Sequence, residues 1–489
     1  MTPSNRHPEP AGRGPVRWRS PAVGILLTVY FAWFARTTLW AHLPPDELMN
    51  IHYYWSLPRW QQVLGPLMVW SPLYRPMAAW FLLPVLAGFG LNPAAFRVEM
   101  LALLLATVFL MYRLSLLLRS GERAAFLTAL IACYHVGING IYYQTQFIYD
   151  VLCGFFFVAA LLYYVSIRDR GRIPGWKQVT IFLGLMLAAL DSKEMALTLP
   201  AVLLFYECFY HAPVPLWRPQ LLGKWLRGPG RSVAAGACLN LVFLYGRIAA
   251  KDGLIHVPGY GPKLSMARVW DFQIHAFADL FQKWEYFGRA GVVALWIAMF
   301  CLAWRRPRPV LRFSCMFLLV APLPIEFLIG RSGACLYIPM LAWALFVTVV
   351  FVDIADGLAG FLAGEPGLRR VGRAGISAVL VIAALVYWVH RNADLKKDYA
   401  DPGAADISPM TWDAIQQMKA FPLHVRPRST MVFLNDPFGT WDMLFIADLV
   451  FRERTLTVRL ARKTPMTSEE IAKADYVFDY RDGRLVQVR

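Results

Sequence analysis

The sequence predicts a mainly α-helical protein that crosses a membrane about eleven times and ends in a small extracytoplasmic α/β domain. Three observations predict this fold class. Hydrophobic residues make up 57% of the 489 positions and charged residues only 17%, whereas roughly a quarter of the residues in soluble domains are charged. Apolar runs of membrane-spanning length alternate with short loops. Lysines and arginines gather in every second loop, as is typical of cytoplasmic loops.

The apolar runs give the order of the predicted spans. The first run follows an arginine-rich start and is longer than the apolar region of a signal peptide, so it is interpreted as a retained span. The runs are Pro21–Ala41, Ala95–Leu118, Ala124–Tyr142, Phe147–Ile167, Val179–Leu190, Met195–Tyr210, Val233–Ala249, Ala290–Trp304, Phe313–Ile329, Cys335–Val352 and Ile376–His390. Basic residues follow every even-numbered run, which places the N-terminus in the cytoplasm and the C-terminus outside.

Charge and cysteine usage exclude two other classes. The net charge of +17 is spread over short loops between apolar runs, so it indicates membrane topology rather than binding to nucleic acid. The seven cysteines form no CxxC pair and no metal-ligand spacing. We therefore expect small, buried hydrophobic side chains at these positions.

The first outer loop, residues 42–94, contains the charged residues that most strongly suggest a functional site. An adjacent acid pair, Asp46 and Glu47, lies just after the first span. Further on, Arg75 and Pro76 open a short apolar helix that ends near Gly90. At about 15 residues this helix is too short to span and is predicted to lie in the interface or to re-enter. A loop that brings two carboxylates and a cation to the membrane surface suggests an active site.

The tail, residues 391–489, has a soluble composition and is predicted to form a separate domain from the transmembrane part, residues 1–390. Thr467 and Glu470 form a capping-box signal before a short helix. The other predicted elements are helices at Met410–Phe421 and Trp441–Arg452, strands at Thr430–Leu434 and Leu456–Leu460, and a closing hairpin of Tyr476–Tyr480 and Leu485–Val488. The tail contains no catalytic motif.

The order of these features resembles the GT-C superfamily of membrane glycosyltransferases, which take a sugar from a polyprenyl-phosphate donor. Asp46-Glu47 resembles the Asp-Glu motif of protein O-mannosyltransferases. Tyr74-Arg75-Pro76 resembles the Lys/His-Pro-Pro helix start of that family and of the lipid A aminoarabinose transferases, although arginine and a single proline stand here.

Three further segments extend the resemblance over about residues 20–390. Gln146–Asp150 is similar to a second outer acid of these families. Asp191–Met195 is similar to their outer Lys-containing turn, which also occurs in transmembrane mannosyltransferases with TPR repeats, although no TPR array follows here. Arg331 with Leu336–Pro339 resembles an Arg-Tyr-Leu-Tyr-Leu-Pro segment. The resemblance implies an inverting sugar transfer.

The acids are the candidate catalytic residues. Sugar transfer needs a carboxylate that deprotonates or orients the acceptor hydroxyl. Asp46 is the first candidate, with Glu47 either supporting it or serving structure, because both acids also suit the first turn of a helix. Asp150 opens a span, where an uncompensated acid is costly and so indicates function, although it too fits a helix start.

The outer cations are the candidate phosphate-binding residues. The departing phosphate gains negative charge, which basic groups neutralise. Arg75, Lys193 and Arg331 lie beside span ends on the outer side, and arginine grips phosphate bidentately whereas lysine acts as a point charge. Each also fits an interfacial residue whose charge reaches the surface.

The aromatic run after the acid pair is the candidate sugar or acceptor contact. His52, Tyr53, Tyr54 and Trp55 follow Glu47 on the same loop. Tyrosine and tryptophan rings stack on sugars, but anchoring at the membrane interface explains such rings equally well.

No cofactor is required by the sequence, although a divalent metal cation is possible. A cation bridging Asp46, Asp150 and the donor phosphate would make chemical sense, but no ligand spacing demands it. His256 and His275, on a later outer loop, are more typical of hydrogen-bonded structural residues.

The sequence therefore predicts a multi-pass glycosyltransferase of a bacterial inner membrane. Its expected partners are a polyprenyl-phosphate sugar donor, membrane lipids and a lipid, glycan or protein acceptor, with no nucleic acid. Three alternatives remain open. A transporter or flippase of polyprenyl-linked sugars would be expected to have internal repeats and broken charged helices. The other two are a surface-polysaccharide ligase or polymerase and a membrane anchor for the tail. The sugar, the acceptor and the oligomeric state are not determined.

Overall fold

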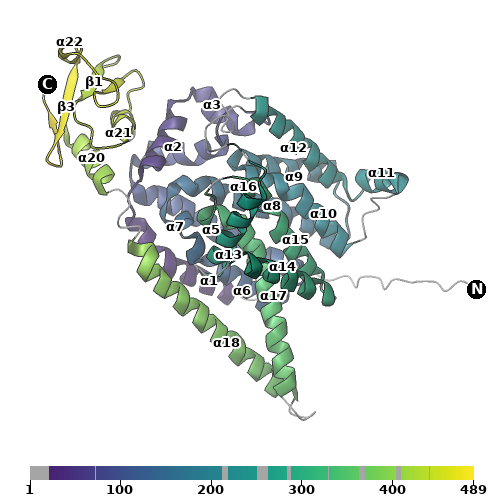
Figure 1. The fold of residues 1–489 in the computed structure, drawn as a ribbon. Coiled ribbons are helices and arrows are strands. Elements are labelled where there is room, and N and C mark those ends of the chain that lie inside the picture. Colours follow the sequence, from purple (N-terminus) through teal and green to yellow (C-terminus); the bar gives the residue numbers. More distant parts are fainter. Residues whose placement is uncertain are drawn as a thin grey trace, which may run out of the picture.

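The computed structural model describes residues 21–71, 73–211, 218–249, 261, 263–282, 288–328, 330–362, 369–402, 409–439 and 441–489. Figure 1 shows a bundle of helices with a small sheet beside α2 (Pro45–Ser56) and with the long helix α18 (Arg369–Leu395) along one side. The predicted His256 lies outside the described residues.

The bundle is built from helices of very different length. They are α1 (Pro21–Ala35), α2, α3 (Arg59–Leu64), α4 (Ala79–Phe89), α5 (Pro93–Leu117), α6 (Glu122–Cys133), α7 (Gly140–Tyr143), α8 (Ile148–Asp169), α9 (Trp176–Ser192), α10 (Leu199–Tyr210), α11 (Pro219–Arg227), α12 (Arg231–Ala249), α13 (Met266–Leu280), α14 (Arg289–Arg305), α15 (Pro309–Val320), α16 (Leu323–Glu326), α17 (Tyr337–Leu362) and α18. Short 3-10 helices connect them: η1 (Arg36–Trp40), η2 (Gly65–Leu67), η3 (Pro76–Ala78), η4 (Val136–Ile138), η5 (Thr145–Phe147), η6 (Glu194–Thr198) and η8 (Gly333–Leu336). A turn of π-helix, η9 (Lys396–Ala400), follows α18.

Six helical stretches in the described residues are long and apolar enough to cross a membrane, so the chain is an integral membrane protein. They are Pro21–Trp40, Pro93–Leu117, Thr145–Asp169, Pro309–Glu326, Gly333–Leu362 and Ala374–Ala400. The other predicted spans fall on helices α6, α9, α10, α12 and α14, which have 12 to 19 residues. The count of about eleven spans therefore stays a prediction.

Burial separates the central helices from the peripheral ones. The apolar window of Gly333–Leu362 is 83% buried, whereas that of Ala374–Ala400 is only 6% buried. An apolar helix whose residues are exposed needs an apolar solvent, which for α18 is the bilayer. The core therefore surrounds α17, and α18 faces lipid.

The third predicted span is not a continuous helix. The sequence predicts a span over Ala124–Tyr142, but α6 ends at Cys133, and the chain passes through extended residues into η4 and α7. The ring of His135 accepts a hydrogen bond from the Gly137 amide, 3.1 Å, which caps this turn. Gly137 packs directly on the Asp279 backbone, so close that a Cβ would collide with its carbonyl. Hydropathy alone does not reveal such a break, because the interrupted segment is just as apolar.

The contact between α8 and α17 gives a direct test of the packing. A Cβ added at Gly154 would lie 2.5 Å from the Tyr337 ring, and Tyr337 is 1% exposed, so the ring cannot move aside easily. We expect Gly154→Ala to destabilise the fold by about 1–3 kcal/mol through overpacking. The measurement is the thermal midpoint of the detergent-solubilised protein.

Gly184→Ala, on α9, is the matched control because nothing lies within 4 Å of an added Cβ there. Alanine is the better helix former, so this variant should keep or slightly raise the midpoint. An unchanged midpoint for Gly154→Ala would contradict the close contact between these two helices.

From Pro409 on, the tail has the helices and strands that the sequence predicts, whereas residues 391–400 continue α18 and form the turn of π-helix. Its sheet has the order β2-β1-β3-β4, with β1 parallel to β2 and β3, and β3 antiparallel to β4. The strands are β1 (Thr430–Phe433), β2 (Thr457–Leu460), β3 (Tyr476–Arg481) and β4 (Arg484–Gln487), and the helices are α20 (Pro409–Ala420), α21 (Asp442–Phe451) and α22 (Ser468–Ala472). The predicted capping box of Thr467 and Glu470 is present at the start of α22. That these residues form an independent domain stays a prediction.

The tail packs on the first loop of the bundle. His52 of α2 contacts Asp448 of α21 at 2.8 Å, Nε2 to Oδ2. Arg452 donates to the carbonyl of Leu86, 2.7 Å, just before the end of α4. These contacts join the tail to α2 and α4, and Figure 1 shows the tail on the side of the bundle where α2 lies.

Candidate active site

The candidate site lies at one end of the bundle, where segments far apart in sequence meet. The turn before η3 carries Arg75, the first turn of α8 carries Asp150, and the junction of α9 with η6 carries Lys193 and Glu194. Three of the predicted site residues are therefore brought together by the fold.

Asp150 and Lys193 form the buried centre of this group. The Lys193 Nζ lies 2.5 Å from Asp150 Oδ1 and 3.4 Å from the Cys335 Sγ of η8. Both side chains are less than a tenth exposed. Burial alone would lower the pKa of Lys193, but the Asp150 carboxylate raises it above its ordinary value. Lys193 is therefore a fixed positive charge.

Arg75 is held in place by its backbone as well as its side chain. Its φ of 42° is left-handed, which costs a non-glycine residue energy and needs support from its surroundings. The Tyr54 hydroxyl provides that support by lying 2.9 Å from the Tyr74 carbonyl and 3.0 Å from the Arg75 carbonyl. The guanidinium reaches Glu194 Oε2 at 3.1 Å and lies over the Tyr149 ring.

Arg247, near the end of α12, is a further cation of the site that the sequence reasoning missed. Its Nη1 donates to the Leu73 carbonyl at 2.6 Å, while its Nε and Nη2 are buried without a hydrogen-bond partner among the described residues. Burial alone would raise the pKa of Glu194, but Arg75 and Arg247 together hold it at about 2. Arg247 falls inside the predicted span Val233–Ala249. An arginine in the last turn of a membrane span is costly, and this cost could have indicated a functional role from the sequence.

The two acids of the first loop have opposite environments. Glu47 is 1% exposed and pairs with the fully buried Arg97, 2.9 Å from Nη1 to Oε1. It also accepts from the Thr145 amide, five residues before Asp150. Asp46 is exposed, and no hydrogen bond or ion pair to it occurs among the described residues. Because Glu47 is tied to the segment before α8, Asp46 and Asp150 lie at the same end of the bundle.

The predicted sugar-contacting residues all make contacts within the protein. His52 pairs with Asp448, and Arg454 lies over the Trp55 ring at 5.3 Å. The Tyr53 hydroxyl accepts from the Tyr74 amide, 3.1 Å, so Tyr53 and Tyr54 both hold the turn that presents Arg75. Their role as sugar contacts stays a prediction.

Arg331 and His275 are the two remaining predicted residues of the outer side that the structure describes. Arg331 is half-buried and precedes η8 by two residues, four residues before the Cys335 that contacts Lys193. His275 is exposed, and its Nδ1 lies 2.7 Å from the Asp271 carbonyl on its own helix. Phosphate binding by Arg331 stays a prediction.

A metal ion does not fit the arrangement around Asp150. The Asp150 carboxylate is already paired with the Lys193 ammonium, which would repel a divalent cation. Within the described ranges, no group of three or more His, Cys, Asp or Glu residues is placed to hold a metal ion. The predicted metal bridge between Asp46 and Asp150 stays a prediction, and the proposed transfer reaction does not require it.

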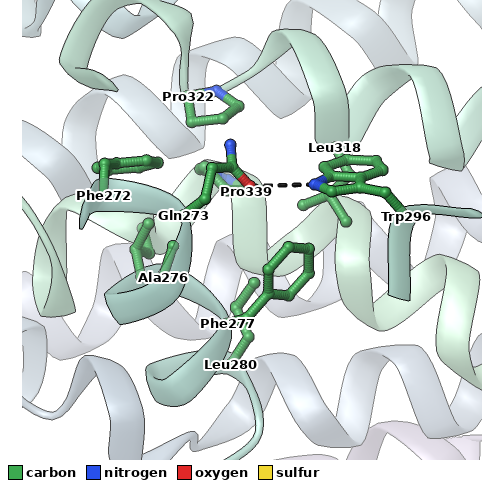
Figure 2. Close-up of a pocket in the computed structure, with 10 residues that line it drawn as sticks. Phe272, Gln273, Ala276, Phe277, Leu280, Trp296, Leu318, Pro322 and Pro339 are labelled. Atoms are coloured by element: carbon green, nitrogen blue, oxygen red, sulfur yellow. Dashed lines mark hydrogen bonds between the residues drawn. The ribbon is translucent and has the colours of Figure 1, made fainter. Parts of the chain in front are cut away.

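A small cavity lies between α13, α14, α15 and α17 (Figure 2). About 10 Å³ is open to the centre of a water molecule, roughly the space that one water needs. Phenylalanine, leucine and proline side chains line most of it, and Trp296 donates to Gln273 Oε1 at 3.2 Å. The cavity is too small for a sugar or a lipid, so it is a packing feature.

Comparisons with known proteins place the fold. No protein-family model matches the chain, and no curated protein matches it significantly. ArnT from Cupriavidus metallidurans bound to undecaprenyl phosphate is 12% identical with a TM-score of 0.51, and the match covers 95% of this chain and 97% of that chain. The oligosaccharyltransferase of Archaeoglobus fulgidus tethered with an acceptor peptide is 11% identical with a TM-score of 0.51, covering 90% and 63%.

The same oligosaccharyltransferase in complex with zinc and sulfate is 10% identical with a TM-score of 0.50, covering 94% and 67%. The chain therefore spans less than two thirds of the peptide-tethered oligosaccharyltransferase but nearly all of ArnT. At such identities the likeness concerns the fold.

Proposed function

We propose that this chain, which has the fold of the GT-C superfamily of membrane glycosyltransferases, transfers a sugar from a polyprenyl-phosphate donor to an acceptor at the extracytoplasmic face. The observation that carries the proposal is the cation cluster of Arg75, Lys193 and Arg247 at the same end of the bundle as Asp46, which is exposed and has no ion-pair partner among the described residues. Cations and an exposed carboxylate at one end of the bundle suit a reaction in which an anion leaves and a hydroxyl attacks.

In the proposed mechanism each charged side chain of the site has one role. Asp46 accepts the proton of the acceptor hydroxyl as its oxygen bonds to the anomeric carbon. The bond from that carbon to the phosphate oxygen breaks, and the phosphate leaves with the electron pair. Arg75 and Lys193, with Arg331 and Arg247, stabilise the charge that develops on the phosphate. Asp150 fixes the Lys193 ammonium and is a positioning residue.

The solved structures support the two substrate classes without selecting an acceptor. ArnT is bound to undecaprenyl phosphate, and the oligosaccharyltransferase is tethered with an acceptor peptide. The first supports a polyprenyl-phosphate donor for this chain, and lipid, glycan and protein acceptors are all candidates. The proposed location is a bacterial inner membrane, with the N-terminus in the cytoplasm and the tail outside.

The deciding experiment is reconstitution of the purified protein in lipid with radiolabelled polyprenyl-phosphate sugars and a panel of lipid, glycan and peptide acceptors. A transferase moves the label into a new covalent product. A transporter or flippase would instead move the labelled lipid between leaflets with no change in its mass, which would refute the proposal. A ligase or polymerase would require a donor carrying a whole glycan.

Arg75 provides the test of phosphate binding. We expect Arg75→Gln to lower kcat/KM for the donor by about 10²–10³-fold, since one preorganised charged donor to the leaving group is lost. Arg75→Lys should recover part of this loss, because the charge stays and the bidentate geometry goes. Arg59→Gln is the control, because Arg59 is an exposed cation on the neighbouring α3. Equal effects of Arg75→Gln and Arg59→Gln would argue against a phosphate role.

Arg247 is expected to have a smaller effect. Arg247→Gln removes the donor to the Leu73 carbonyl and one charge beside Glu194, which should raise the donor KM by about 10- to 100-fold, the range for hydrogen bonds to charged groups. Steady-state kinetics with varied donor would measure it. A wild-type KM would exclude Arg247 from the donor site.

A further inference from the structure

The end of the bundle away from Asp150 carries a second concentration of charge. Helix α9 begins at Trp176 there and ends at Ser192, next to Lys193, and its 17 residues span roughly 25 Å. Helix α11 lies at this far end and stands out at the margin of the bundle near α10 and α12 in Figure 1. The loop before α9 and the segment of α11 up to the start of α12 together form what we call the basic face, residues 170–178 and 218–231.

The basic face has no acidic residue to balance it. Neither segment contains Asp or Glu, and the same is true of residues 211–217 between α10 and α11. None of its cations forms an ion pair with a carboxylate in the described part of the chain. The cations are Arg170, Arg172, Lys177, Arg218, Lys224, Arg227 and Arg231. Such a group of like charges needs counter-ions from outside the protein.

Arg231 joins the two segments into one surface. Its Nη1 donates to the Pro174 carbonyl at 3.4 Å, and its Nη2 donates to the Arg227 carbonyl at 2.6 Å. The guanidinium carbon also lies 4.7 Å from the centre of the Trp176 ring. These three contacts of Arg231 therefore hold the loop against α11. The backbone positions from which the surrounding lysine and arginine side chains extend are fixed relative to one another.

Apolar side chains are exposed among these cations. Ile173 is 51% exposed, Trp176 69% and Leu221 42%. Exposed tryptophan and aliphatic side chains next to basic ones are typical of a segment that lies at the boundary between lipid tails and headgroups. Exposed apolar side chains placed directly among cations therefore favour a lipid surface over a soluble protein partner.

We propose that the basic face binds the headgroups of anionic phospholipids, with the phosphodiester groups contacting Lys224, Arg227 and neighbouring cations while Trp176 and Leu221 enter the acyl boundary. The charge is complementary, and arginine grips phosphate oxygens in a bidentate manner. The proposal does not depend on the proposed transfer reaction, because it concerns the opposite end of the bundle.

The test is native mass spectrometry of the full-length protein in detergent, titrated separately with phosphatidylglycerol, phosphatidylcholine and inorganic phosphate. The wild type should retain phosphatidylglycerol in preference to phosphatidylcholine. The double variant Lys224→Gln/Arg227→Gln should bind phosphatidylglycerol about 25-fold more weakly, since each basic residue near an anionic lipid surface contributes on the order of fivefold. Both side chains are exposed, so the thermal midpoint should not change.

Arg59→Gln/Lys397→Gln removes the same charge from exposed positions outside the basic face, and should bind phosphatidylglycerol like the wild type. Three outcomes would overturn the proposal: equal retention of the two lipids, unchanged binding by the Lys224→Gln/Arg227→Gln variant, or complete competition by inorganic phosphate at equal concentration, which would mean a site for free anions.

Discussion

Asp46→Asn is expected to lower the rate of sugar transfer by about 10²–10⁴-fold, the range for a lost general base. Asparagine keeps the size of the side chain but accepts no proton at neutral pH. Because Asp46 is exposed and has no partner in the described structure, its replacement disturbs no contact that stabilises the fold. The measurement is single-turnover transfer of labelled sugar by the reconstituted enzyme, together with the thermal midpoint.

The control is Asp413→Asn, because Asp413 is also an exposed aspartate, on α20 in the tail. It should transfer sugar at the wild-type rate. If Asp46→Asn is as active as this control, Asp46 is not the base, and the acceptor must be activated elsewhere. If donor binding is lost instead of the chemical step, Asp46 contacts the donor rather than the acceptor.

Glu47→Gln is expected to destabilise the protein by about 3–5 kcal/mol, because it leaves a buried guanidinium without its counter-charge. Arg97 is fully buried, and its other described acceptors are the His42 carbonyl and the Thr145 hydroxyl, which are neutral. The loss should appear as a marked fall in the thermal midpoint and in the yield of folded protein. This outcome would assign Glu47 to structure, the second of the two roles that the sequence allows.

The double variant Glu47→Gln/Arg97→Gln separates charge from packing. Removing both charges should cost less than the sum of the two single variants, since neither charge is then left unpaired. A Glu47→Gln protein with the wild-type thermal midpoint but no transfer activity would contradict the structural role. Glu47 would then be a catalytic group.

Local signals made the tail predictable. The capping box of Thr467 and Glu470 depends on two residues three positions apart, and the closing hairpin depends on the short turn around Gly483. Interactions over so few residues act in any tertiary context. The boundaries of α20, α21 and the strands consequently agree with the predicted ones to within one residue at most ends.

Pairing between distant residues was not predictable. Glu47 and Asp46 are neighbours with the same chemistry, yet one is paired with Arg97, 50 positions away, and the other faces solvent. His52, predicted as a sugar contact, reaches an aspartate 396 positions away in the tail. Arg247 lies within an apolar run, and the sequence does not indicate that the folded chain places it near Glu194.

The sequence by itself determined that this protein lies in a membrane, that its first loop carries acids and cations, and which short elements its tail forms, because hydropathy and local turn chemistry are properties of neighbouring residues. Only the tertiary structure decided where the helices break, which acid is buried and which cations share one end of the bundle. In a membrane, hydropathy does not distinguish one apolar helix from another. The partners of a charged side chain are therefore set by how the helices pack and not by the pattern along the chain.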